Sequence, residues 1–268
     1  MRTLMLCLIS VTPGLTCEAA AAEQTEMPAV DRLEALGFRS LFNGRDLTGW
    51  KIPVGDNGHW KVVDGVIDYD ALSESKQNKN LLSESDFGDF TLYLEWRFKR
   101  TAGMYPVPTI LADGSYKMDA DGKQIVTLTP NADSGLLLRG VQHQVNLWCW
   151  PIGSGELWSV RNNQKLTAEQ RAAAVPKACA DKPVGQWNQM MVTMDGDRVT
   201  VVLNGVKVID NAQIPGIQPT GPIGFQHHGG RLNEKQIKRL KDQNLPVDPE
   251  GMNEASSLVQ FRNVYIKQ

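Results

Sequence analysis

The sequence lacks any marked imbalance of charge and any long run of one sign: 28 Lys and Arg stand against 30 Asp and Glu, for a formal net charge of −2. Proteins that bind nucleic acid or an anionic membrane surface carry a concentrated positive patch, so neither partner is expected. The four histidines and four cysteines show no zinc-ligand spacing, and there is no glycine-rich phosphate loop. Asp119–Gly122 is at most a fragment of a calcium loop, so the sequence identifies no specific cofactor and the involvement of a divalent metal stays open.

Long apolar runs are also missing, which decides how the N-terminus is interpreted. The run Leu4–Ile9 is far shorter than the ~20 residues of a membrane-spanning helix, so no membrane span is expected. Ala19–Ala22 offers Ala-x-Ala cleavage sites, and residues 1–22 are predicted to be a signal peptide that directs the protein to the periplasm or the medium. Acylation at Cys17 would give a lipoprotein instead, but Thr16 occupies a position where a smaller residue is expected.

Cysteine is scarce in the mature chain. Cleavage of the signal peptide would leave only Cys149 and Cys179. In an oxidising compartment the two could form a disulfide, which would stabilise the fold by ~3 kcal/mol. Two separate buried thiols are the alternative, and the sequence leaves both open.

Short alternating runs separated by turn residues make up most of the chain. The clearest strand is Phe90–Phe98, where apolar and polar side chains alternate, and Asn204-Gly205 and Asp64-Gly65 are hairpin signals. The acids of Glu84–Asp89 superficially resemble the spaced acids of retaining glucanases, but this stretch does not alternate and is predicted to be a loop. Many short strands without a βαβ rhythm predict an all-β protein, a two-sheet sandwich or jelly roll.

Helical signals are few. Residues 23–37 are predicted to form an N-terminal segment with one short helix that stops at Gly37. The capping box of Thr167 and Gln170 and the basic amphipathic stretch Asn233–Gln243 predict short helical insertions on the β scaffold. No internal repeat or linker is found, so residues 38–268 are predicted to be one domain.

Several strands carry reactive or ligand-binding side chains on a face where a purely solvent-exposed sheet would carry ordinary polar residues. These side chains are Tyr93, Glu95 and Arg97 on one strand, Gln144, Asn146 and Trp148 on another, and Gln226 and His228 near a turn. Such groups bind sugar hydroxyls and stack on sugar rings. A solvated surface residue is the better explanation for any one of them alone, and Glu95 with Arg97 also fits a surface ion pair. Their recurrence on several strands favours a carbohydrate site.

Six stretches of the chain resemble a known family. They are Phe38–Trp50, Gly88–Arg97, Ala132–Gly140, Pro183–Asn188, Gly221–Gly229 and Phe261–Val264. In this order, from residue 38 to the C-terminus, they are similar to the 3-keto-disaccharide hydrolase family, formerly a domain of unknown function. The resemblance implies a concanavalin-like (lectin-like) jelly roll that acts on 3-keto-glycosides in the cell envelope, with a sugar 3-dehydrogenase as a partner that supplies the keto-sugar.

The implied chemistry follows from the ketone. A carbonyl at C3 acidifies the hydrogen on C2, so a base can remove it, an electrophile can hold the enolate, and the group on C1 can leave before water adds. By their positions in the family motifs, Glu95 is predicted to be the base, Arg139 the enolate clamp and His228 the proton donor. A cross-strand ion pair is the alternative role for Arg139.

The predicted substrate-binding residues surround these three. They are Arg97, Gln144, Asn146, Trp148, Glu156, Gln226 and Arg262. The chain departs from many family members at Asp133, where they carry Asn, and at Gln144, where they carry Glu; Glu156 is predicted to substitute for the missing acid. Because a carboxylate is lost at Gln144, a non-catalytic lectin-like module is the second hypothesis. An ordinary glycoside hydrolase is least favoured, since no strand carries a pair of acids.

Overall fold

The computed structural model describes residues 23–268 except 102–103, 229, 232–233, 243, 245–251 and 254–257. The predicted signal peptide and Cys17 lie outside the described residues. Within the part of the chain that is described, no helix is long and apolar enough to cross a membrane.

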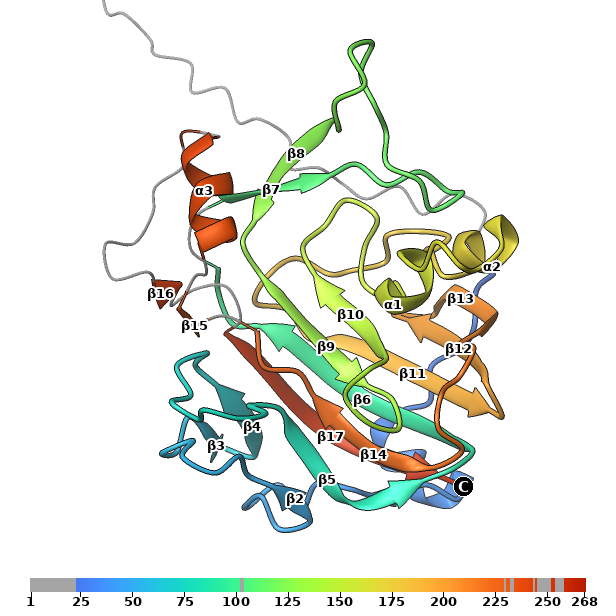
Figure 1. Cartoon of the computed structure of the whole chain (residues 1–268). Coiled ribbons are helices and arrows are strands. Elements are labelled where there is room, and N and C mark those ends of the chain that lie inside the picture. Colours follow the sequence, from blue (N-terminus) through green and yellow to red (C-terminus); the bar gives the residue numbers. More distant parts are fainter. Residues whose placement is uncertain are drawn as a thin grey trace, which may run out of the picture.

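Two antiparallel sheets pack face to face and make the protein a jelly-roll β-sandwich, as expected (Figure 1). The larger sheet has the order β13-β12-β11-β6-β17-β4-β3, with β1 paired to β17. Its strands are β1 (Arg39–Ser40), β3 (Trp60–Val63), β4 (Val66–Tyr69), β6 (Phe90–Phe98), β11 (Asn188–Asp195), β12 (Arg198–Leu203), β13 (Val206–Gln213) and β17 (Val259–Lys267).

The smaller sheet has five strands in the order β10-β9-β14-β5-β2. They are β2 (Trp50–Lys51), β5 (Leu81–Phe87), β9 (Asp133–Leu137), β10 (Gln144–Trp148) and β14 (Gly221–Phe225). Two further strand pairs stand apart from both sheets: β7 (Met104–Pro108) with β8 (Val126–Pro130), and β15 (Gly230–Arg231) with β16 (Met252–Asn253).

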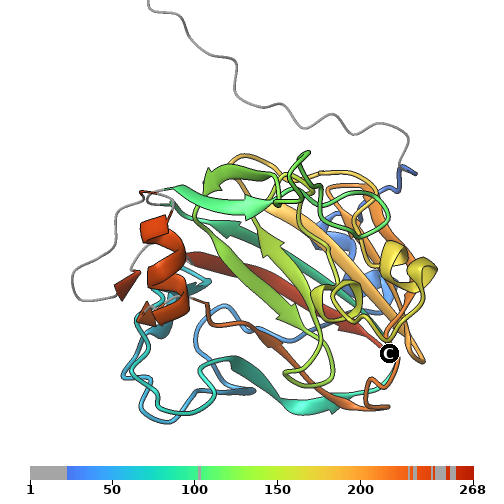
Figure 2. The ribbon, with the colours of Figure 1, turned by 45° about the horizontal axis from the view of Figure 1, so that its top comes forward.

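Helices are short and peripheral. They are the 3₁₀-helices η1 (Val30–Arg32) and η2 (Glu34–Leu36), and the α-helices α1 (Trp158–Arg161), α2 (Ala168–Ala173) and α3 (Glu234–Asp242). The expected helix before Gly37 is thus two 3₁₀ turns, and Gly37 ends them with a φ of 85°. The capping box of Thr167 and Gln170 starts α2 as predicted. Helix α3 and the pair α1–α2 lie beyond opposite lateral edges of the smaller sheet, at the left and right of Figure 2.

Both hairpin predictions are confirmed, and the loop prediction for Glu84–Asp89 is wrong. Asp64-Gly65 joins β3 to β4 and Asn204-Gly205 joins β12 to β13, and all four residues have the positive φ that such two-residue turns need. Strand β5 runs through most of the supposed loop. Its register against β14 shifts between Pro222 and Gly224. This bulge interrupts the alternation of buried and exposed residues, so the sequence shows no period of two there.

The Cys149–Cys179 disulfide is not formed. Cys149 carries a free thiol, while Cys179 takes part in a different disulfide. The two side chains have different surroundings: Cys149 packs against the hydrophobic core, and the Sγ atom of Cys179 lies 3.8 Å from a carboxylate oxygen of Asp181.

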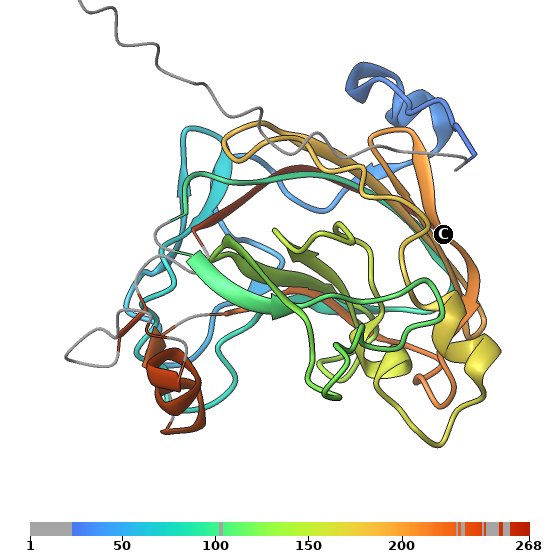
Figure 3. The ribbon, with the colours of Figure 1, turned by 90° about the horizontal axis from the view of Figure 1, so that it is seen from above.

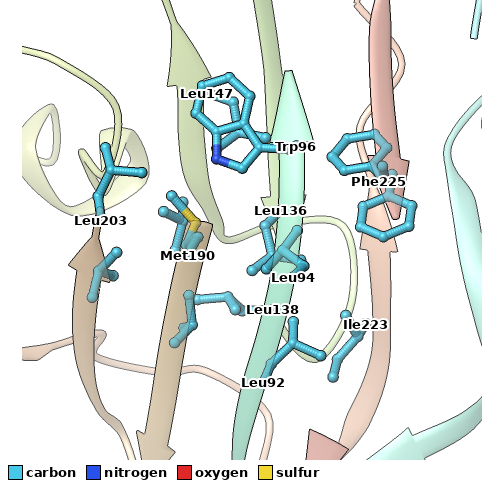
Figure 4. Close-up of a cluster of buried hydrophobic side chains, with 14 of the residues drawn as sticks. Leu92, Leu94, Trp96, Leu136, Leu138, Leu147, Met190, Leu203, Ile223 and Phe225 are labelled. Atoms are coloured by element: carbon cyan, nitrogen blue, oxygen red, sulfur yellow. The ribbon is translucent and has the colours of Figure 1, made fainter. Parts of the chain in front are cut away.

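The core lies between the sheets and takes one face of each. On β6, Leu92, Leu94 and Trp96 point towards Leu136 and Leu138, which project from β9 and its end (Figure 4). The ring of Phe225 stacks between those of Trp50 and Phe261, with centroid distances of 5.0 and 3.8 Å. Because alternate residues of a strand face opposite ways, the remaining side chains form two outer faces on opposite sides of the molecule. Figure 3 shows the two sheets as separate layers.

Candidate active site

The outer face of the smaller sheet gathers five of the predicted site residues, of which His228 is described below. On β10, Val145 and Leu147 enter the core, so Gln144, Asn146 and Trp148 point to the other side. The same alternation after β14 turns Phe225 inward and Gln226 outward. Figure 1 looks onto this face, which lies in front of the larger sheet.

Gly135 lies between the two glutamines. It pairs in register with Asn146 and its carbonyl accepts a hydrogen bond of 2.8 Å from the backbone of Gln226. A Cβ atom at this glycine would lie 2.9 Å from Oε1 of Gln144 and 3.1 Å from Oε1 of Gln226. The missing side chain therefore leaves room for two amide groups to converge on one place. Oε1 of Gln226 is buried and has no hydrogen-bond partner among the described residues.

His228 follows on the same face and meets Asp133. Its Nε2 atom lies 3.4 Å from a carboxylate oxygen of Asp133, and the two side chains are 39% and 25% exposed. Burial raises the pKa of the Asp133 carboxyl, and the imidazole of His228 opposes that shift. Nδ1 of His228 is buried without a hydrogen-bond partner in the described part of the chain. An imidazole that faces a carboxylate can take up and release a proton near neutral pH, so His228 is suited to move a proton. His227 faces the other way and contacts the hydroxyl of Tyr69.

Behind the two glutamines, a buried polar network runs into the loop after β10. The amide of Gln144 contacts that of Asn146, whose Nδ2 donates 2.8 Å to Glu156. The other oxygen of Glu156 contacts Nε of Arg161, and both side chains are at most 1% exposed. Burial raises the pKa of Glu156 to about 7, although the guanidinium of Arg161 works against this. Glu156 is close to Gln144, as predicted, but it is completely enclosed and does not reach the surface.

Trp148 is placed on the predicted face but is not an open stacking platform. It is 3% exposed, its ring lies 4.0 Å from that of Trp150 in a parallel stack, and its Nε1 donates to the carbonyl of Gly153. Its role is thus to hold the loop after β10 against the sheet.

The structure does not bring Glu95 to this face. Glu95 belongs to β6, and its neighbours Leu94 and Trp96 point into the core, so its carboxylate projects from the outer face of the larger sheet. There it accepts from Nε of Arg262 at 2.6 Å and from Nδ2 of Asn263 at 3.1 Å, and it is 5% exposed. The sequence pattern correctly turned Glu95 outward, but it could not say which sheet β6 joins.

Arg97 and Arg262 share that opposite face with Glu95. The guanidinium groups of both arginines lie over the ring of Trp187, at 4.5 and 4.1 Å from its centroid. Arg97 also donates 2.8 Å to Gln260 on the adjacent β17. These residues cannot contact a ligand bound beside His228, because the whole sandwich lies between the two faces.

Arg139 is also separated from His228. It follows β9, whose first residue is Asp133, so strand rise places it ~20 Å from the His228 end of the sheet. Its guanidinium donates to the carbonyls of Gly88, Gly196 and Gln218 and to Asp89. With a side chain only 1% exposed, it holds these loops together, and it lines a cavity of about 730 Å³ at this end of the sheet with Gly88 and Pro219.

Asp133, Gly135 and Arg161 belong to the site and were not among its predicted residues. The register of β9 against β10, which pairs Asp133 with Trp148 and Gly135 with Asn146, would have revealed the first two. Arg161 gives no such signal, because it reaches Glu156 from a helix. In the described ranges, no group of three or more His, Cys, Asp or Glu side chains could hold a metal ion.

One solved structure shares this fold with a TM-score above 0.5, and two others are similar at lower scores. A candidate glycosyl hydrolase from Parabacteroides distasonis is 20% identical, with 91% of this chain and 99% of that chain covered and a TM-score of 0.52. The carbohydrate-binding module CBM66 from Bacillus subtilis is 13% identical over 87% and 96% of the two chains, with a TM-score of 0.35. An endo-beta-1,3(4)-glucanase of family GH16 is 12% identical over 92% and 96%, with a TM-score of 0.42.

No curated protein matches the sequence. The family described as the 3-keto-alpha-glucoside-1,2-lyase-like domain matches residues 37–267, which is most of the chain. This is the family whose motifs the sequence resembles. The matched region begins two residues before β1 (Arg39–Ser40). The chain therefore belongs to the 3-keto-alpha-glucoside-1,2-lyase-like domain family.

Proposed function

We propose that the protein cleaves 3-keto-glycosides on the outer face of the smaller sheet and that His228 moves the proton. The observation that carries this proposal is the pairing of His228 with Asp133 beside the convergent amides of Gln144 and Gln226. Family membership supports a carbohydrate-active, hydrolase-like protein, and this arrangement supplies both a proton carrier and groups that can hold a sugar.

The reaction needs one proton transfer to begin. The imidazole takes the proton from C2, the electrons of that C–H bond form the enolate, and the enolate oxygen is the former C3 carbonyl. As the ketone re-forms, the bond from C1 to the leaving oxygen breaks, and that oxygen takes up the proton that the imidazole removed from C2. Water then adds across the new double bond, with its hydroxyl at C1 and its hydrogen at C2, and the sum is hydrolysis.

In this scheme, the carboxylate of Asp133 assists the imidazole of His228. A carboxylate that faces Nε2 stabilises the imidazolium that forms when His228 takes up the proton. We assign Glu95 and Arg139 no part in the reaction, because their side chains are committed elsewhere in the fold.

The test uses p-nitrophenyl 3-keto-α-glucoside and the unoxidised parent glucoside. Release of p-nitrophenol from the keto form alone is expected, since only the ketone acidifies C2. His228→Ala should lower the rate by ~10²–10⁴, the usual contribution of a general base or acid. His59→Ala is the matched control: His59 also faces a carboxylate, that of Asp70 at 2.9 Å, but it lies beside β3 of the larger sheet. Full activity of the His228 variant would refute the assignment.

The lectin-like hypothesis gives a different result in the same experiment. A binding module would bind the keto and parent glucosides without releasing p-nitrophenol from either. We further propose that the protein works in the periplasm or medium, which the signal-like N-terminus supports. Fractionation of producing cells tests this. The expected dehydrogenase partner finds no support in the comparisons.

A further inference from the structure

In the buried network behind Gln144, each hydrogen bond has a fixed donor and a fixed acceptor. At a pH above its pKa of about 7, Glu156 is ionised and held by Arg161, and it can then only accept hydrogen bonds. Asn146 must therefore turn its Nδ2 towards Glu156, at 2.8 Å, which leaves Oδ1 on its other side. Gln144 contacts this Oδ1 and must donate to it through Nε2. With Nε2 turned towards Asn146, the carbonyl oxygen Oε1 is the atom that Gln144 presents beside Gly135, 2.9 Å from the position of a Cβ atom there.

The oxygen Oε1 of Gln144 needs a hydrogen-bond donor, and neither orientation of the Gln226 amide changes the fact that the site presents an acceptor. If its oxygen faces the site, two acceptor oxygens converge near Gly135, and the one on Gln226 is buried without a partner in the described chain. If its amide is turned the other way, Nε2 faces Gln144 and Oε1 is displaced towards another part of the site. In both orientations, the chain of hydrogen bonds that starts at Glu156 ends on an amide oxygen that can accept a hydrogen bond from the ligand.

We infer that Glu156 is a positioning residue, which through Asn146 fixes the amide of Gln144 so that the site presents an acceptor to a hydroxyl donor of the ligand. Glu156 itself is 0% exposed and never touches the ligand. The inference rests on the proposed function only in taking the ligand to be a sugar. It assigns the polarity of one subsite: a neutral polyol fits it, whereas a carboxylate or phosphate, which offers only acceptors, does not.

Fluorine substitution of the ligand shows whether a hydroxyl group binds by donating a hydrogen bond or only by filling space. Methyl α-glucoside and its 2-, 3-, 4- and 6-deoxyfluoro analogues are titrated against the full chain by NMR at pH 8.5. Fluorine fills nearly the same space as a hydroxyl group but cannot donate. Wild-type protein is expected to bind one analogue about tenfold more weakly than the parent, which is what one neutral hydrogen bond is worth.

Two variants then test the relay. Gln144→Met keeps the length of the side chain and removes its oxygen, so the parent and that analogue should bind equally well. Glu156→Gln combined with Arg161→Met replaces the buried ion pair by neutral groups, which avoids an unpaired buried charge. A glutamine at 156 can donate, so Asn146 and Gln144 lose their fixed direction and the tenfold ratio should fall towards one. Gln189→Met, on the larger sheet, is the matched control and should keep the ratio.

The ratio of the two affinities is the deciding readout, because a structural defect would weaken both ligands alike. If the double variant fails to fold, Asn146→Leu breaks the same relay and should also abolish the ratio. An unchanged ratio in Gln144→Met and in a folded relay variant would overturn the inference, as would a wild-type protein that binds every analogue equally or binds none. Because this assay needs no turnover, loss of catalysis on the keto substrate would refute the proposed function and leave this inference standing.

Discussion

Gly135 offers a sharp test of where the substrate binds. In Gly135→Ala the new Cβ atom would meet the amide oxygens of Gln144 and Gln226 at 2.9 and 3.1 Å, well inside ordinary contact. Each amide has to retreat by a few tenths of an ångström. Both are the ends of flexible side chains, so this retreat costs little, and alanine also restricts the unfolded chain by ~0.4–1 kcal/mol. The free energy of unfolding should stay within about 1 kcal/mol of the wild type.

Activity should change much more than stability. A misplacement of ~1 Å in a positioned group can lower a rate ~100-fold, so a shift of about half that should lower kcat/KM roughly tenfold. That loss corresponds to ~1.4 kcal/mol of transition-state stabilisation. The measurements are kcat/KM with p-nitrophenyl 3-keto-α-glucoside and urea denaturation followed by tryptophan fluorescence.

Gly88→Ala is the matched control for this prediction. Its Cβ atom would meet only Pro219 and Thr220, at 3.6 Å, which is ordinary van der Waals contact, and it lies at the Arg139 end of the sheet. It should keep both stability and activity. Full activity in a folded Gly135→Ala protein would show that Gln144 and Gln226 do not hold the substrate.

Three further outcomes follow from the buried charges. Glu95→Gln should destabilise the fold by ~2 kcal/mol, because Arg262 loses its charged acceptor, and a rate more than threefold below wild type in folded protein would contradict its placement. Arg139→Met should cost ~3 kcal/mol or more by leaving three backbone carbonyls without a donor, with kcat of the folded protein unchanged; a thermal melt beside the kinetic assay decides. Burial raises the pKa of Asp181 to about 6, above its ordinary 3.8, so wild-type protein loses stability as pH rises through that window. Asp181→Asn should therefore match wild type at pH 4 and exceed it by up to ~3 kcal/mol at pH 8, and equal denaturation curves at both pH values would refute the shift.

Alternation of side chains was the most reliable signal in the sequence. It correctly turned Leu92, Leu94 and Trp96 inward and Glu95 outward. Turn chemistry likewise located both two-residue hairpins. Where a bulge disturbed the alternation, as in β5, the strand was missed. These features are local, because they depend only on the backbone geometry of neighbouring residues.

The sequence alone was therefore sufficient for the all-β class, the two-sheet architecture, the family, and the outward-facing residues of those strands that alternate regularly. It could not determine which outward faces coincide, since that depends on the pairing of strands distant in the chain. Tertiary structure placed Glu95 and Arg139 away from His228, joined Asp133 to it, and enclosed Glu156 with Arg161. The physical reason is that a strand fixes the direction of its side chains locally, whereas its place in a sandwich is fixed only when two sheets bury their apolar faces against each other.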